Sequence, residues 1–264
     1  MKTIIAATDF SAPAENAMLY AAAMASKVKA SLILLHVYQI PVSMAEVPVL
    51  MISAEELRHA ADEGLKNAKA IVASAYPLLE VNIESRLGEV TEELNELCKS
   101  IGPVAIVTGK HGSSGLERLF FGSTSLSIVR HSNYPVIVIP DHTNNHEIKN
   151  IALAVDDLKD QLPKEKIREF ISTVGAQLHI VHVQSNKTAV NELDEVVSFL
   201  GSKCTTIHSD EFFEGLQNYL MEHHIDMLII LPHKHSFMER LTFRTHTEEL
   251  LKKLSIPVAC IMED

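Results

Sequence analysis

The sequence is poor in positive charge, in long apolar runs and in cysteine, and each scarcity excludes a class of protein. Lys and Arg number 23 against 34 Asp and Glu, so the formal net charge is −11. This argues against nucleic acid or an anionic membrane as a partner, because both are bound through clustered cations. No apolar run approaches a membrane span, and the first residues make a poor signal peptide because Asp9 interrupts them. The three widely spaced cysteines are typical of reduced packing residues, so we expect a cytoplasmic protein.

Familiar catalytic and nucleotide motifs are also missing. The chain has neither the Gly-x-x-x-x-Gly-Lys-Ser/Thr of a Walker A loop nor the Gly-x-Gly-x-x-Gly of a Rossmann turn. The Gly-x-Ser-x-Gly elbow of hydrolases is absent. The Ser-Gly-Gly-x-Asp-Ser loop of pyrophosphatase-type synthetases and the His-Ile-Gly-His of nucleotidyl transferases are absent as well. The sequence therefore assigns no catalytic residue.

One glycine-rich window stands out, residues 109–124, which holds four of the ten glycines. It follows an apolar run at 104–108 that predicts a strand, and it leads into a predicted helix at 123–131. Glycine lets a ligand approach the backbone, and a helix N-terminus with free amides and hydroxyls favours an anion. The window therefore predicts a phosphate-binding loop. The alternative without a ligand is an ordinary surface loop with turns.

The first half of the chain alternates strands and helices. Short apolar runs predict strands at 3–8, 31–37, 79–86, 103–108 and 135–139, and helical patterns lie between them at 11–29, 53–75, 90–99 and 123–131. A long proline-containing loop is expected at 38–52. This alternation predicts an α/β fold with a parallel sheet that is covered by helices on both faces.

The second half repeats the first. Ile-Ala-Leu-Ala-Val-Asp at 151–156 matches Ile-Ile-Ala-Ala-Thr-Asp at 4–9, and Ile-Pro-Val-Ala-Cys-Ile at 256–261 matches Tyr-Pro-Val-Ile-Val-Ile at 134–139. The offset between the copies falls from 147 to 122, so the second copy is 25 residues shorter, mostly between its second and third strands. We call residues 1–141 the first repeat and residues 148–264 the second, and we expect each to form one domain.

Only the first repeat keeps the glycines. Its Gly109, Gly112, Gly115 and Gly122 correspond to Leu231, Lys234, Phe237 and Arg244. Because side chains now stand where bare backbone was needed, we expect one nucleotide site per chain and a degenerate loop in the second repeat.

The spacing of Gly109, Gly112, Gly122 and Ser123 is the G-2x-G-9x-G-(S/T) pattern of the ATP-binding branch of the universal stress proteins, and the chain resembles a tandem member of that family. The resemblance implies two tandem open parallel five-stranded sheets with helices on both faces, the adenine nucleotide α-hydrolase-like fold. It implies a regulatory or sensor protein of the stress response with ATP as its ligand, with or without Mg²⁺. Because family members pair through the fifth strand, a homodimer or an internal pseudo-dimer of the two repeats is expected.

The resemblance also assigns residue roles. Asp9 would contact the ribose or adenine end, and Val37 would line the adenine pocket through its backbone. The residues that would hold ribose and phosphates are Gly109, Gly112, Gly122, Ser123 and Thr124.

Each assignment has a structural alternative. Asp9 and the hydroxyls of Ser123 and Thr124 are also ordinary helix caps, and Val37 is also an ordinary core residue. A second functional reading is a nucleotide-independent scaffold that responds to metal through His233 and His235, although no established zinc motif surrounds them. A slow ATPase is a third, disfavoured because no catalytic base is evident.

Overall fold

The structure, a computed structural model, describes residues 2–40, 53–110, 123–141, 143, 146–155, 162–184, 193–208, 212–232 and 254–262. In the first repeat the elements are β1 (Thr3–Ala7), α1 (Ala12–Val28), β2 (Ser31–Tyr38), α2 (Ala54–Ala75), β3 (Val81–Leu87), α3 (Val90–Ile101), β4 (Ala105–Gly109), α4 (Ser123–His131) and β5 (Val136–Ile139). In the second they are β6 (Asn150–Val155), α5 (Lys164–Val174), β7 (Gln177–Gln184), α6 (Leu193–Leu200), β8 (Cys204–His208), α7 (Phe212–Glu222), β9 (Met227–Ile230) and β10 (Val258–Cys260).

Local sequence signals explain where the helices begin and end. Ser11 caps α1 by accepting a hydrogen bond from the Ala14 amide, and a proline follows in the first turn. Ser53 and Glu56 form the capping box that the sequence predicts at the start of α2. Gly102 ends α3 in the left-handed conformation, with a φ of 63°. In the part of the chain that the structure describes, no helix, the 22-residue α2 included, is long and apolar enough to cross a membrane.

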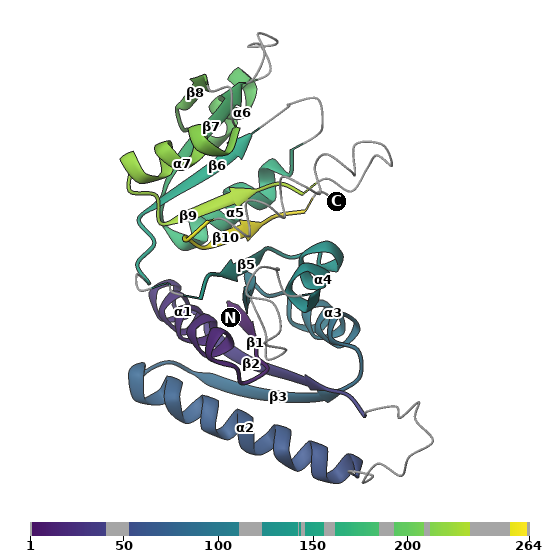
Figure 1. Cartoon of the computed structure of the whole chain (residues 1–264). Coiled ribbons are helices and arrows are strands. Elements are labelled where there is room, and N and C mark those ends of the chain that lie inside the picture. The colour runs from purple at the N-terminus through teal and green to yellow at the C-terminus, as the bar shows by residue number, and fades with distance from the viewer. Residues whose placement is uncertain are drawn as a thin grey trace.

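The strands form one continuous sheet in the order β3-β2-β1-β4-β5-β10-β9-β6-β7-β8 (Figure 1). The two five-stranded parallel sheets that the sequence predicts are its two halves. They join where β5 pairs with β10 antiparallel, with Val136 opposite Cys260 and Val138 opposite Val258. The fifth strands of the two repeats therefore meet within a single chain.

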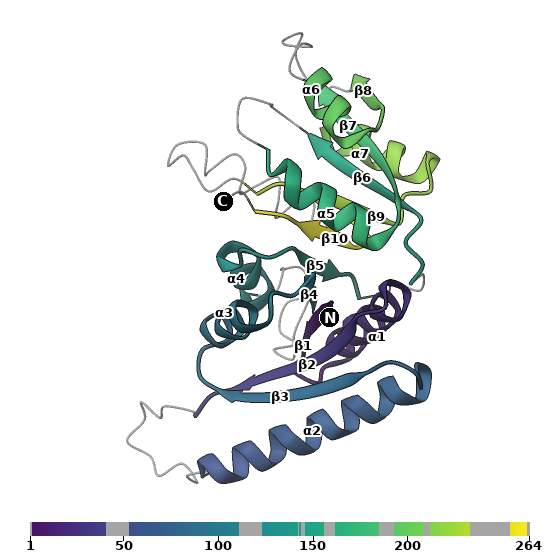
Figure 2. The same ribbon diagram turned by 180° about the vertical axis from the view of Figure 1, so that it is seen from behind.

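Helices cover both faces of the sheet. One apolar cluster contains the buried side chains of α1, α2 and α5 with one face of the strands, and a second contains those of α3, α4 and α7 with the other face. Both clusters run through the β5–β10 seam, because Ile137 and Ala259 belong to the first and Val136 and Val258 to the second. Helices α1 and α5 also contact each other across the seam (Figures 1 and 2). The two repeats thus share their cores.

The second repeat is smaller at its outer end. The connection between its second and third strands spans residues 185–203, against residues 39–80 in the first repeat. Its helix α6 has 8 residues where α2 has 22. The shortening therefore falls beside β8, at the edge of the sheet farthest from the seam (Figure 2).

Candidate functional site

The first repeat has a topological switch point between β1 and β4, which are neighbours in the middle of its half-sheet. The chain leaves β1 through α1 on one face toward β2, and it leaves β4 through α4 on the other face toward β5. Crevices beyond the carboxyl ends of two such strands are where open α/β sheets bind ligands. Asp9 follows β1 and Gly109 ends β4, so both residues lie at this point.

The Asp9 carboxylate is tied to the start of α1. Its Oδ1 accepts hydrogen bonds from the Ser11 amide at 3.0 Å and from the Ser11 hydroxyl at 2.5 Å. The N-cap of α1 is Ser11 and not Asp9, so Asp9 supports the entry into the helix by holding the capping residue, and this contact fixes the carboxylate at the rim of the switch point. A helix-entry contact does not preclude a ligand contact, since a carboxylate has two oxygens and about four acceptor sites.

Gly109 is required by a close approach of backbone. A Cβ on Gly109 would lie 2.9 Å from the Pro13 carbonyl oxygen and 3.3 Å from the Ala14 amide nitrogen. Its neighbour across the glycine loop is Ser125, whose hydroxyl donates to the Gly109 carbonyl at 2.7 Å and lies 3.4 Å from the Thr108 hydroxyl. The end of β4 is therefore packed on the N-terminus of α1 and bonded to the first turn of α4.

Ser123 and Thr124 are the first two residues of α4, and both are exposed. The first turn of α4 contains no acidic residue, whereas Arg130 and His131 lie in its last turn. The unbonded amides and the dipole of a helix N-terminus favour an anion, so this end of α4 suits a phosphate. Gly112 and Gly122, which the sequence places in the same phosphate-binding loop, lie outside the described residues.

Lys110 supplies a cation beside Gly109. Its amide donates to the Ile139 carbonyl at 2.9 Å, and its side chain is half-buried. Burial lowers the pKa of Lys110, and the negative charge of Asp141 opposes that shift in part. A cation that is incompletely solvated responds strongly to a nearby anion.

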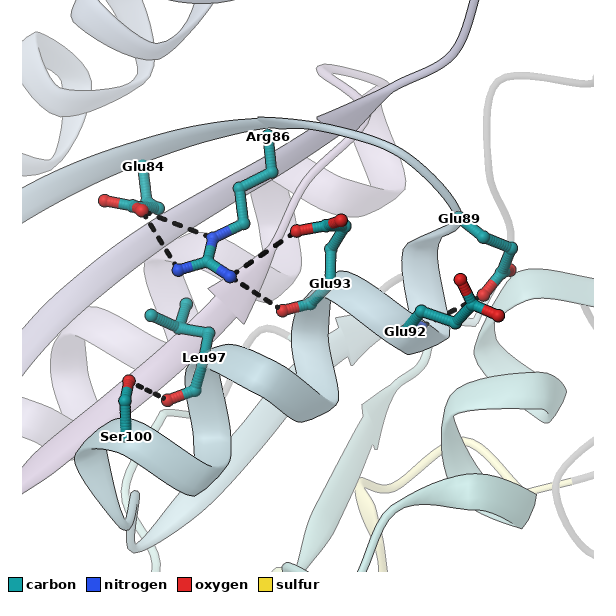
Figure 3. Close-up of polar contacts among 7 residues, drawn as sticks. All are labelled: Glu84, Arg86, Glu89, Glu92, Glu93, Leu97 and Ser100. Carbon is teal, nitrogen blue, oxygen red and sulfur yellow. Dashed lines mark hydrogen bonds and ion pairs between the residues drawn. The ribbon is translucent and has the colours of Figure 1, made fainter.

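Val37 lies near the end of β2, beyond the last β1–β2 register pair, which joins Ala7 to Leu35. On its other side it is in register with Arg86 of the edge strand β3. Figure 3 shows the Arg86 guanidinium between two carboxylates, 3.2 Å from Glu84 Oε1 and 3.5 Å from Glu93 Oε2, and it also donates to the Glu93 carbonyl. Arg86 thus ties the edge strand to α3 next to Val37.

Sequence reasoning missed several side chains at this edge of the sheet. The His36 ring bonds the Thr8 carbonyl, the Phe10 ring stacks on His36, and Thr108 and Ser125 tie the two ends of the glycine loop. Of these side chains, only Ser125 had a signal in the sequence, because it belongs to the Ser-Thr-Ser run at the start of α4.

The second repeat differs at the corresponding point. Leu231, which replaces Gly109, is 6% exposed, and α5 begins nine residues after β6 ends, whereas α1 begins five residues after β1 ends. A buried side chain therefore stands in the second repeat where the first repeat needs a glycine. Asp156, Lys234, Phe237 and Arg244 lie outside the described residues.

His233 and His235, on which the metal hypothesis depended, also lie outside the described residues. Within the described ranges, no three or more His, Cys, Asp or Glu side chains gather as metal ligands. The second repeat does contain an aromatic cluster of His179, Tyr219 and His223, with the Tyr219 and His223 ring centroids 4.0 Å apart. Burial lowers the pKa of His179.

Comparison with known proteins extends this description. A sequence profile of the universal stress protein family matches residues 1–140. Universal stress protein G of Shigella flexneri is 32% identical over 87 residues, and the match covers 32% of this chain and 58% of that relative. A universal stress protein of Synechocystis sp. is 26% identical over 292 residues, covering 98% of this chain and 99% of the relative. The crystal structure of a universal stress protein from Archaeoglobus fulgidus superposes with a TM-score of 0.71 at 17% identity, covering 99% of this chain and 96% of that one, which shows a shared fold.

Proposed function

The chain belongs to the universal stress protein family, and from this premise we propose that its first repeat binds ATP as a regulatory or sensed ligand of a stress response. The observation that carries the proposal is the switch point between β1 and β4, with Asp9 and Gly109 at its two strand ends and the N-terminus of α4 beside it. In this proposal residues 1–141 form the nucleotide-binding domain and residues 148–264 a domain without that site.

Each part of the nucleotide has a matching part of the site. The triphosphate lies against the amides and hydroxyls of Ser123 and Thr124, with Gly112 and Gly122 giving the loop its close approach. Asp9 accepts a hydrogen bond from the ribose or the adenine, and the Val37 backbone lines the adenine pocket. Lys110 adds positive charge near the phosphates, in a chain whose net charge is −11.

Mg²⁺ would bind at this site together with the phosphates of the nucleotide. The described residues provide no group of three or more metal-ligating side chains. Magnesium keeps several waters and is commonly held by one or two carboxylates together with substrate phosphates. When bound, the ion would neutralise phosphate charge, and Asp9 is a carboxylate at the strand ends that could approach it.

Binding without rapid turnover is the function that the site supports. ATP hydrolysis requires a residue that orients the attacking water, together with stabilisation of the charge that develops in the transition state. We assign this role to none of the described side chains at the switch point: Asp9 holds Ser11 at the start of α1, and Ser125 ties the end of β4 to α4. Bound ATP then acts through conformational populations, to the extent that its affinity differs between two states of the protein.

The proposed assembly is an internal pseudo-dimer. Because β5 is already paired with β10, it offers no open edge to a second chain. Size-exclusion chromatography with light scattering should therefore give the mass of one chain, 29.2 kDa. A mass of two chains would show that another surface supports a homodimer.

Calorimetric titration of ATP tests the binding function. The unmodified protein should bind one ATP per chain, and Gly122→Arg, which copies Arg244 of the second repeat, should abolish binding. Ser74→Arg introduces the same charge on an exposed residue of α2 and should bind ATP like the unmodified protein. A folded, nucleotide-free protein that binds no ATP would refute the proposal, and release of phosphate at a steady rate would favour the slow ATPase.

A further inference from the structure

Among the described residues, the carboxyl end of β1 leaves the Val37 N–H and C=O without a partner on the β1 side. Backbone groups alternate in direction along β2: the Ser31 amide bonds the Lys2 carbonyl and the Leu35 carbonyl accepts from the Thr8 amide, both on the β1 side. The Tyr38 carbonyl accepts from the Gly88 amide on the β3 side. Val37 lies two residues after Leu35, and backbone groups two residues apart in a strand point the same way. Its N–H and C=O therefore point toward the β1 side.

If β1 continued by two residues, Val37 would have two partners there. Extending the register of Ala7 with Leu35, a parallel ladder would bond the Val37 N–H to the Thr8 carbonyl and the Val37 carbonyl to the Phe10 N–H. Both expected partners, the Thr8 carbonyl and the Phe10 amide, are bonded to side chains instead. His36 Nδ1 lies 2.8 Å from the Thr8 carbonyl oxygen, and the Phe10 amide donates to Thr8 Oγ1 at 3.0 Å. Because a carbonyl oxygen only accepts, His36 Nδ1 must carry the hydrogen.

Packing holds this arrangement in place. Phe10 has a φ of 64°, so the chain turns out of the strand direction immediately after Asp9. The Phe10 ring stacks on the His36 ring with 4.3 Å between centroids, and its edge occupies the space over Gly64 of α2, where a Cβ would meet it at 2.6 Å. β1 pairs with β2, and α2 packs on β2 and β3, below them in both views (Figures 1 and 2). The His36 ring is therefore clamped between Phe10 and the Thr8 carbonyl.

We propose that His36 is a positioning residue for the nucleotide site: by taking the Thr8 carbonyl, it leaves the Val37 N–H and C=O as an adjacent donor and acceptor for the edge of the base. Among the described residues neither group of Val37 has a hydrogen-bond partner on the β1 side. Such a pair matches a planar ring that carries an acceptor next to a donor, as adenine does at its ring nitrogen and amino group. This inference rests on the proposed ATP site and names what prepares its base-binding edge.

The second repeat provides a matched control. His182 Nδ1 lies 3.0 Å from the carbonyl oxygen of Val155, which corresponds to Thr8. The two histidines thus make the same contact, one in the repeat with the glycine loop and one in the repeat without it. Removing either ring loses this hydrogen bond, but only the loss of the His36 ring should affect the base-binding edge.

The test measures Val37 amide hydrogen exchange by NMR and ATP affinity by calorimetry, in the unmodified protein, His36→Leu and His182→Leu. Without ATP, the Val37 amide should exchange at least about tenfold more slowly in His36→Leu than in the unmodified protein, because the released Thr8 carbonyl can accept its hydrogen bond. A merely structural role would give the opposite result, since loosening speeds exchange. ATP affinity should fall about tenfold in His36→Leu and stay unchanged in His182→Leu.

Thr8→Val is a second variant of nearly the same shape. It removes the hydroxyl that accepts the Phe10 amide, so that amide becomes available to the Val37 carbonyl, and ATP affinity should again fall severalfold. The inference is overturned if the Val37 amide is already protected without ATP in the unmodified protein, or if His36→Leu changes neither exchange nor affinity. If the unmodified protein binds no ATP, the proposed function fails, while the ATP-free exchange comparison still decides the role of His36.

Discussion

Replacing Gly109 by Ala tests how closely β4 approaches α1. The new Cβ would lie 2.9 Å from the Pro13 carbonyl oxygen, 3.0 Å from the Pro13 carbonyl carbon and 3.3 Å from the Ala14 amide nitrogen. Comfortable contacts between such atoms begin at about 3.5 Å, so strand and helix must separate by roughly half an ångström. All three atoms are backbone at the start of α1, and none can rotate away.

The expected cost follows from that overlap. Forcing an extra carbon into a well-packed interior lowers the free energy of unfolding by about 1–3 kcal/mol. Urea denaturation should show a lower midpoint with an unchanged slope, which indicates a loss of stability rather than a different unfolded state. ATP affinity should fall too, because Asp9 and Ser11 lie at the displaced end of α1.

Gly102→Ala separates crowding from the general cost of losing a glycine. A Cβ on Gly102 meets nothing within 4 Å, so only its left-handed φ of 63° makes the substitution unfavourable, by about 1 kcal/mol. That variant should bind ATP normally, since it lies at the far end of α3. The packing argument is wrong if Gly109→Ala is as stable as the unmodified protein within ~0.5 kcal/mol.

Three further substitutions probe other parts of the fold. Tyr20→Phe should keep or raise the free energy of unfolding, by up to about 1 kcal/mol, because the Tyr20 hydroxyl is buried and has no hydrogen-bond partner among the described residues; a clear loss in urea denaturation would contradict this. Glu89→Ala should cost about 1 kcal/mol near neutral pH through the lost cap of α3. The hydrogen bond from Thr91 holds the pKa of Glu89 below its unfolded value, so this contribution is full above the unfolded pKa and is lost as the pH falls through the folded pKa; an acid titration of both proteins should show the gap closing. Arg86→Met should lower the thermal midpoint by leaving two carboxylates without their shared cation, and high salt should reduce the loss by screening them.

Much of the fold is predictable from the sequence because strands buried on both faces carry continuous apolar runs. Ile4 and Ile5 of β1, Ile106 of β4 and Ile151 of β6 are all fully buried, and the runs of β1 and β6 are among those that mark the repeat. The seam was expected from family resemblance alone. Its register, with Ala259 opposite Ile137, joins residues far apart in the chain, and no local pattern specifies such a pairing.

The candidate site is less predictable from the sequence, because it depends on how backbone segments far apart in the chain approach each other. The glycine spacing points to Gly109, but the reason that position excludes a side chain, the start of α1, appears only in three dimensions. Phe10 is a poor candidate for a left-handed turn on propensity, since a bulky residue rarely takes a positive φ. Its ring gains a stacked partner in His36, and that tertiary contact overrides the local preference.

Fusion of the two repeats explains how one of them could lose its glycines and its second-strand loop while keeping the fold. In a homodimer every substitution appears in both subunits, so a change that removes the site from one removes it from the other. In this chain the two copies vary separately, and the features that join them are retained: β5 pairs with β10, Lys27 donates to the Ile148 carbonyl, and α1 contacts α5. The shortened part lies around α6 and β8, at the opposite edge of the sheet. The second repeat therefore completes the shared core of the first, whatever ligand its own strand ends accept.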